Sequence, residues 1–160
     1  ISAGRLFESM KSGEIKKTYV AIVCGVPSPP KGIVDAPIAR ADFGILMRTV
    51  SAEGREARTE YNTVASSADG KYSMVVLRPL TGRTHQIRVH MAHIGHPVLG
   101  DEVYGGSRHP AAMRHSSLID GQCLHAARLE LTHPRTRERM TFTAPLPEKT
   151  EKLLAILRRG

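Results

Sequence analysis

Short apolar stretches with strand-like patterns dominate this chain. Residues 14–25 become continuously apolar toward their end, and residues 71–77 are similarly rich in β-branched and aromatic side chains. Residues 57–65 alternate, so that Thr59, Tyr61 and Thr63 share one face of a half-exposed strand. The further predicted strands are 33–40, 44–50, 123–131 and 138–142, the last two joined by a turn at 133–135. These strands follow one another as an antiparallel meander.

Helical periodicity marks three segments. Residues 84–94 place Ile87, Met91 and Ile94 on one stripe, with Thr84 as the N-terminal cap and Gly95 as the stop. Residues 148–158, preceded by a proline, predict a final helix that buries three leucines, and residues 3–12 predict a first one. Residues 105–117 are polar and irregular, which predicts a loop. Together the elements predict an α+β fold: a mixed, mainly antiparallel β-sheet with flanking helices, in which residues 1–160 form a single piece.

Charge narrows the choice of partner. The net charge is +8 and the isoelectric point is near 9.9, as expected of a domain that meets a polyanion. Four tyrosines, three phenylalanines and no tryptophan are too few for a broad stacking platform, but one or two tyrosines could stack on a single extruded base.

The N-terminus, the apolar runs and the cysteines indicate the cellular compartment. The longest apolar run, residues 20–26, is too short to span a bilayer, and no signal peptide is recognisable. Cys24 and Cys123 lie among apolar neighbours, as reduced core cysteines do. We therefore expect an intracellular protein, in the cytoplasm or in an organelle. The first residue is Ile1 rather than Met, so we expect the chain to be processed or to be a piece of a longer polypeptide.

The densest group of candidate chemical side chains lies in residues 78–106. Five polar side chains gather at the start of the predicted helix: Arg83, His85, Gln86, Arg88 and His90. Backbone N–H groups, the positive end of the helix dipole and side-chain donors can together hold phosphates there. A structural role is the alternative, since Arg88 could equally pair with a buried carboxylate from elsewhere in the chain.

A metal site and a nucleotide cofactor have little support. His90, His93 and His96 are spaced by three, but Gly95 should end the helix before His96, and no carboxylate completes a ligand set. The Gly-x-Gly-x-x-Gly and phosphate-loop patterns are absent, and so is the Gly-x-Ser-x-Gly elbow of hydrolases. We therefore expect neither a metal nor a cofactor.

Two motifs carry a family resemblance. Residues 78–90 read RPLTGRTHQIRVH, and residues 95–106 read GHPVLGDEVYGG. Both closely resemble the signature of the RluA-type pseudouridine synthases. Residues 15–25, with Lys17 and Tyr19, resemble the family's Lys-x-Tyr strand, and residues 32–40 and 124–147 resemble its connecting segment and C-terminal hairpin.

The resemblance implies an enzyme that isomerises a flipped-out uridine in structured RNA, rRNA or tRNA, to pseudouridine. The C–N glycosidic bond breaks and the uracil rejoins through C5, without metal or nucleotide cofactor. Arg88 matches the arginine that ion-pairs with the catalytic aspartate, and Tyr19 matches the tyrosine that stacks on the target base. Arg83, His85, Gln86, His90 and Lys17 are the expected RNA contacts, and we expect a monomer.

One essential residue of that pattern is absent. The family's aspartate lies in a His-Arg-Leu-Asp motif upstream of the Lys-x-Tyr strand, and no aspartate precedes Tyr19 here. Asp35 and Asp101 match family positions outside that motif, where a structural role is expected. We expect the aspartate upstream of Ile1, in which case the chain is the C-terminal portion of a catalytic domain. The alternative is an inactive RNA-binding remnant of the same fold.

Overall fold

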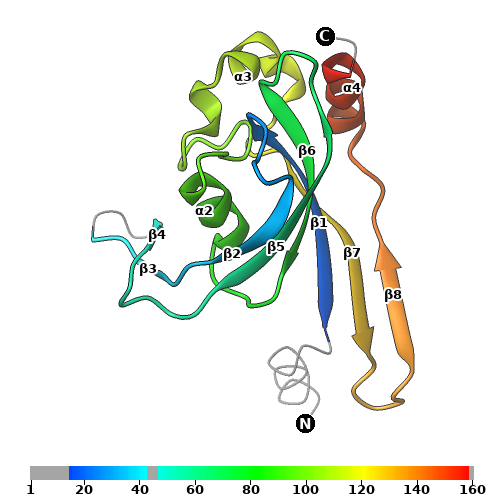
Figure 1. Cartoon of the computed structure of the whole chain (residues 1–160). Coiled ribbons are helices and arrows are strands. Elements are labelled where there is room, and N and C mark those ends of the chain that lie inside the picture. Colours follow the sequence, from blue (N-terminus) through cyan, green and yellow to red (C-terminus); the bar gives the residue numbers. More distant parts are fainter. Residues whose placement is uncertain (1–14, 43–46, 159–160) are drawn as a thin grey trace.

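The core of the protein is a six-stranded antiparallel sheet with the order β2-β5-β6-β1-β7-β8, seen in a computed structural model that describes residues 15–42 and 47–158 (Figure 1). Its strands are β1 (Lys16–Cys24), β2 (Lys31–Asp35), β5 (Arg58–Ser66), β6 (Tyr72–Pro79), β7 (Leu124–Thr132) and β8 (Arg139–Thr143). A separate hairpin pairs β3 (Ile38–Arg40) with β4 (Arg48–Val50). The predicted α+β class and mainly antiparallel sheet are confirmed, and every strand pairing in the described residues is antiparallel.

Most strand predictions are correct, but the predicted strand 33–40 is divided. Its first half pairs with β5 in the large sheet, and its second half pairs with β4. Pro37 stands at the break and has no N–H to donate to a ladder, so the chain changes sheets there. The predicted helix at residues 3–12 and part of the strand at 44–50 lie outside the described residues.

The two faces of the sheet are covered by different helices. On β1, Ala21 and Val23 point to one face, where they pack with Ile87 and Met91 of α2 (Gln86–His93). Ile22 and Cys24 point to the other face and share a cluster with leucines of α4 (Glu148–Leu157). The alternating burial of β1 therefore assigns α2 and α4 to opposite faces, and the leucine stripe predicted for the last helix is confirmed (Figure 1).

The start of α2 differs from the prediction. His85, not Thr84, occupies the cap position, with φ 57° and no capping hydrogen bond from its side chain. The helix therefore begins two residues later than predicted, after a left-handed turn. Its end is as predicted, because Gly95 has φ 84° and its N–H donates to the carbonyl of Ala92. Ile87 and Met91 are buried and Ile94 is partly buried, so the apolar stripe is confirmed.

A closed hydrogen-bond network joins α2 to the sheet. The Gln86 amide nitrogen donates to Thr59 Oγ1 at 3.0 Å, and Thr59 lies 2.8 Å from Nδ1 of His90. Nε2 of His90 lies 2.9 Å from the carbonyl oxygen of Ala36, and Gln86 Oε1 accepts from Thr81 and from the backbone of Arg83. Both ring nitrogens of His90 are thus engaged, which suits a neutral ring with its proton on Nε2. The network fixes the rotation of α2 on β5.

The segment predicted as a loop at 105–117 is helical. It contains the 3-10 turns η1 (Gly106–Arg108) and η2 (Ser116–Leu118) and the short helix α3 (Pro110–Arg114). His109 Nδ1 accepts from the Ala111 N–H, and Pro110 occupies the first turn, where a missing N–H costs nothing. The prediction was wrong because two small residues, Ala111 and Ala112, bury this short helix against the α4 cluster.

Gly106 closes the loop between α2 and η1. A Cβ at this position would lie 1.6 Å from the carbonyl oxygen of Val98, a fully buried residue. The loop is further tied by hydrogen bonds from the Gly100 N–H to Gly106 and from the Ser107 N–H to the Asp101 carbonyl. The backbone around Asp101 is therefore rigidly positioned.

We predict that Gly106→Ala, in the complete protein, lowers the free energy of unfolding by about 3 kcal/mol or more, because backbone atoms must move to admit the methyl group. Gly82→Ala is the matched control, since a Cβ there meets nothing within 4 Å. Urea unfolding of both variants measures the difference. Equal stability of the two variants would contradict the close approach.

Protonation of His90 should weaken the fold in mild acid. Burial lowers the pKa of His90 below its ordinary value of 6.5. The unfolded chain then binds a proton that the folded chain excludes, so the contribution of neutral His90 is present above pH 6.5 and is lost as the pH falls. We expect a progressive loss as the pH falls below 6.5, and one excluded proton can cost at most about 1 kcal/mol between pH 6.5 and 5.5. His90→Gln should be less stable at pH 7.5 and should show a shallower decline, whereas His115→Gln should decline as wild type does; parallel curves for all three proteins would refute the assignment.

Candidate active site

A bidentate ion pair stands at the centre of the candidate site. Arg88 Nε donates to Oδ2 of Asp101 at 2.7 Å, and Nη2 donates to Oδ1 at 2.9 Å. The Asp101 side chain is fully buried, and that of Arg88 is 11% exposed. The helix supplies the guanidinium and the glycine-bounded loop supplies the carboxylate, so the pair also joins these two elements. Charge-assisted bonds of this fork geometry are among the strongest in proteins.

Asp101 is held in its ionised form. Its Oδ1 also accepts the backbone N–H groups of Val103 and Tyr104, both at 3.0 Å. Burial by itself raises the pKa of this carboxyl, but the hydrogen bonds from Arg88 and from the Tyr104 backbone outweigh it, and the pKa is lowered. The hydrogen bond to Asp101 likewise raises the pKa of Arg88. Both groups are therefore charged at neutral pH.

The Tyr104 ring packs against the Arg88 guanidinium, and its hydroxyl contacts the backbone of Arg48. The Arg88 guanidinium carbon lies 5.0 Å from the centre of the Tyr104 ring, a cation–π distance. The Tyr104 hydroxyl accepts the backbone N–H of Arg48 at 3.1 Å and lies 3.0 Å from Nδ1 of His85. The hydroxyl therefore joins the backbone of Arg48 to the ring of His85.

His85 is neutral at pH 7. Partial burial, followed by the nearby charges of Arg88 and Arg48, lowers the pKa of His85 below its ordinary value. Its ring stands edge-on to Tyr104, with the two ring planes at 79°. The left-handed backbone at His85 gives this side chain its direction, so the unexpected turn before α2 serves the site.

Arg88 keeps unused donors. Within residues 15–42 and 47–158, Nη1 has no hydrogen-bond partner, and it is not sealed from solvent. A guanidinium has five N–H groups, and Asp101 uses two of them. The site can therefore hold a second acceptor, such as a carboxylate or phosphate oxygen, beside Asp101.

The structure places Tyr19 on the α2 side of the sheet. Its half-buried ring packs against the cluster that contains Ile87 and Met91 of α2, the helix that also carries Arg88. Lys17, two residues earlier on β1, is half-buried. The pairing of β1 with β7 shifts between Thr18 and Tyr19, and such an irregularity turns a strand locally.

The predicted RNA contacts separate into two groups. His85 and Arg83 are partly exposed, and Arg83 Nε donates to the carbonyl of Glu56. Gln86 and His90, in contrast, are 4% and 0% exposed and direct their polar atoms into the network with Thr59. Their positions suit a role in orienting α2 and do not suit direct contact with RNA.

The ion pair confirms the structural role expected for Asp101 and the alternative that Arg88 pairs with a buried carboxylate from elsewhere in the chain. Sequence reasoning did not name Asp101 as that partner, however, and it gave Tyr104 of the same GHPVLGDEVYGG motif no role. An aspartate in an otherwise apolar and glycine-rich loop, shortly after a helix bearing an unpaired arginine, was the available signal. The distance between residues 88 and 101 in the chain gives no geometric hint of their contact.

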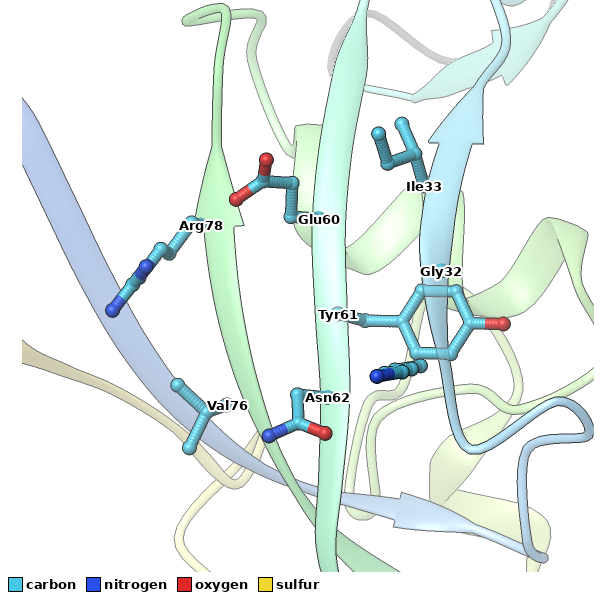
Figure 2. Close-up of a pocket in the computed structure, with 8 residues that line it drawn as sticks. Gly32, Ile33, Glu60, Tyr61, Asn62, Val76 and Arg78 are labelled. Atoms are coloured by element: carbon cyan, nitrogen blue, oxygen red, sulfur yellow. The ribbon is translucent and has the colours of Figure 1, made fainter.

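A large surface hollow lies elsewhere. Side chains of β2, β5 and β6, including Lys31, Ile33, Glu60 and Arg78, line a space of about 640 Å³ on the sheet (Figure 2). On β5, Tyr61 lies between Glu60 and Asn62, and its ring is buried on the α2 face. Successive side chains of a strand alternate between faces, so Glu60 and Asn62, with their cross-strand partners Arg78 and Val76, lie on the opposite face. The hollow is therefore separate from Arg88 and Tyr19.

The described residues contain no group of three or more His, Cys, Asp or Glu side chains placed to hold a metal ion. His90 is buried and His93 is exposed, while Nδ1 of His96 lies 2.9 Å from the Cys24 carbonyl oxygen. The three histidines considered as metal ligands therefore do not converge on one point. Both cysteines are free thiols. Within the same residues, no helix is both long and apolar enough to cross a membrane.

Comparison with known proteins gives one consistent result. The family model described as RNA pseudouridylate synthase matches residues 2–93. The dual-specificity RNA pseudouridine synthase RluA of Salmonella typhi is 44% identical over 141 residues, covering 88% of this chain and 61% of the relative. The ribosomal large subunit pseudouridine synthase D of Pasteurella multocida is 39% identical over 160 residues, covering 96% of this chain and 48% of the relative.

Solved structures agree. Human RNA pseudouridylate synthase domain containing 4 superposes with a TM-score of 0.74 at 27% identity, over 97% of this chain and 67% of that chain. The chain spans about half the length of most of the curated relatives that it matches. Because the family model covers more than half of the chain and both site motifs fall in matched regions of these relatives, the chain belongs to the RNA pseudouridylate synthase family, in its RluA-type branch.

Proposed function

We propose that the complete protein is an RNA pseudouridine synthase and that this chain supplies the basic wall of its active site. The observation that carries the proposal is Arg88, which is fixed by Asp101 and Tyr104, while its Nη1 meets no acceptor among the residues that the structure describes. A catalytic carboxylate brought to Nη1 would be held ionised by the adjacent cation, as a nucleophile requires.

Asp101 is unsuited to be that nucleophile. It is fully buried and accepts four hydrogen bonds, two from Arg88 and two from backbone N–H groups. Oδ1 accepts three of these bonds and Oδ2 accepts one, and a fully buried side chain is not accessible to a substrate atom. The proposal therefore places the catalytic aspartate upstream of Ile1, and Asp101 becomes the residue that positions Arg88.

Tyr19 is the proposed face for the extruded base. Flipping a uridine out of its stack costs a few kcal/mol, and stacking on an aromatic ring offsets part of that cost. His85, whose other ring nitrogen is not engaged by Tyr104, offers a hydrogen-bonding group to the RNA, while Arg83 and Lys17 contribute positive charge. In this scheme the N1–C1′ bond of the uridine breaks, the uracil rotates while held by Tyr19, and a C5–C1′ bond forms. C5 then loses its proton and N1 gains one, so the product is an isomer and no metal or nucleotide cofactor is needed.

The substrate class is proposed from the same relatives. RluA is named as a dual-specificity enzyme and synthase D is named for the ribosomal large subunit, so structured rRNA or tRNA is the proposed substrate of this protein. We further propose that it acts as a monomer inside the cell, in the cytoplasm or in an organelle. The arrangement of Arg88 and Tyr19 suits any flipped uridine, because neither residue reads the neighbouring bases.

An inactive RNA-binding remnant is the second candidate. It shares the wall but lacks the upstream aspartate. Expression of the complete gene product and mass-spectrometric detection of pseudouridine in RNA incubated with it separates the two candidates. Pseudouridine formation that is lost when the upstream aspartate is changed to Asn supports the enzyme, whereas RNA binding without any product supports the remnant.

Arg88→Lys tests the fork. Lysine keeps the charge but cannot bind Asp101 and a second carboxylate in fixed geometry, so kcat for pseudouridine formation should fall about a hundredfold to a thousandfold. Arg128→Lys, which changes an exposed pair with Glu130, is the matched control and should retain full activity. Arg88→Met is a poorer test, because it leaves Asp101 buried and unpaired and should cost about 3–5 kcal/mol of stability. Full turnover by folded Arg88→Lys would refute the role of the arginine.

Two substitutions at Tyr19 separate the ring from the hydroxyl. Tyr19→Phe keeps the stacking face, so any fall in kcat, expected at about a hundredfold, reports proton transfer by the hydroxyl. Tyr19→Leu removes the stacking face as well and should be slower still, with RNA affinity changed less than about threefold because phosphate contacts dominate binding. Single-turnover assays and filter binding measure these quantities, and an unaltered rate for Tyr19→Leu would remove Tyr19 from the mechanism.

A further inference from the structure

A second basic site lies beside the candidate active site. A hollow of about 470 Å³ opens between the β3–β4 hairpin, the segment at residues 53–55 and the turn at residues 82–84 that precedes α2. Four arginines line it, and we call it the arginine pocket: Arg40, Arg48, Arg55 and Arg83. The other three arginines are far from Arg83 in the sequence, so it is the fold that brings the four charges together.

The four arginines of the arginine pocket form no ion pair with the described part of the chain. Glu53 is the one acidic residue that lines it. Within residues 15–42 and 47–158, none of the four arginines has a carboxylate oxygen within 4 Å, although seven other ion pairs form there. Like charges gathered without counterions repel one another, and an anion entering between them relieves that repulsion.

The backbone of the arginine pocket is built to hold this arrangement. Arg55 and Ile38 exchange two backbone hydrogen bonds of 2.9 Å, and a Cβ at Gly54 would lie only 2.5 Å from the Ile38 carbonyl carbon. Arg83 Nε is anchored on the Glu56 carbonyl, which leaves its terminal amino groups for another partner. The side chains of Arg40 and Arg55 are exposed, so their charge is available to a ligand.

The arginine pocket is continuous with the Arg88 site. The Arg48 N–H donates to the Tyr104 hydroxyl, and the Tyr104 ring lies under the Arg88 guanidinium. Val50 of the hairpin and Tyr104 both pack on the cluster of Ile38 and Val89, which fixes the hairpin on α2. A chain of anionic groups could therefore run from one site to the other along a single surface.

We propose that the arginine pocket binds backbone phosphates of the RNA strand next to the target uridine. Guanidinium groups match phosphate oxygens in bidentate geometry. The lining that the structure describes contains arginines and backbone but no aromatic side chain, so these residues suit the RNA backbone rather than the bases. The inference rests on the proposed function for the identity of the RNA, but it concerns a different set of residues.

The double variant Arg40→Gln/Arg55→Gln tests the arginine pocket in the complete protein. Both side chains are exposed, so the fold should be preserved, which thermal unfolding checks. Binding of the RNA substrate at low salt should weaken about tenfold or more. The slope of log K against log salt should become less steep by about 1.5, since each lost phosphate contact removes about 0.7–0.9. The KM for RNA should rise with kcat within about threefold of wild type.

Lys31→Gln/Arg78→Gln is the matched control. It removes two positive charges from the hollow on the opposite sheet face shown in Figure 2, so it should leave the salt slope within about 0.5 of wild type. Equal losses in the two double variants would mean that net charge alone matters, and unchanged binding by Arg40→Gln/Arg55→Gln would also overturn the proposal. Competition by poly-glutamate as effective as that by single-stranded RNA would indicate a general polyanion site and would overturn it too.

The outcomes also separate this inference from the proposed function. If the wild-type protein makes no pseudouridine, but Arg40→Gln/Arg55→Gln binds RNA more weakly than wild type, the enzyme is refuted and the phosphate site is supported. If the wild-type protein makes pseudouridine, and the variant has the same KM and salt slope as wild type, the enzyme is supported and the phosphate site is refuted.

Discussion

The ion pair between Arg88 and Asp101 is the contact on which the candidate site depends. It joins the helix that carries the site arginine to the loop that follows, in a place where neither charge could remain unpaired without a large cost in stability. The guanidinium is directed by this pair and supported by Tyr104, which in turn holds His85 and the Arg48 backbone. A single buried carboxylate thus sets the direction of a cation that remains available to a further partner.

The polar side chains of α2 fall into two groups, those that hold the helix on the sheet and the one that serves the site. Gln86, Thr59 and His90 satisfy one another inside the protein and hold α2 in one rotation on the sheet. Arg88 leaves the same helix on another side and reaches the surface. Residues that are adjacent in the motif therefore have different tasks, and the helical rotation of about 100° per residue divides them.

The sequence predicted those features that depend on local pattern. The alternation in residues 57–65, the apolar run of β1 and the leucine stripe of α4 each arise from one segment that buries one face. The same reasoning missed α3, because its burial depends on α4, far along the chain. It also could not distinguish buried Gln86 and His90 from partly exposed Arg83 and His85, since it began the helix at Thr84, whereas the left-handed turn at His85 leaves Arg83 and His85 outside α2. The arginine pocket needs three segments to meet, and no periodicity records such a meeting.

The central place of β1 in the sheet has a consequence for biosynthesis. β1 is the first strand described, yet its two neighbours are β6 and β7, at residues 72–79 and 124–132. During synthesis, β1 therefore stays unpaired on at least one edge until the ribosome has made residues 124–132. Such distant pairings raise the contact order and slow folding, and an unpaired apolar strand is prone to aggregate meanwhile. The strand that presents Tyr19 is thus also the segment of this fold that most needs protection on the nascent chain.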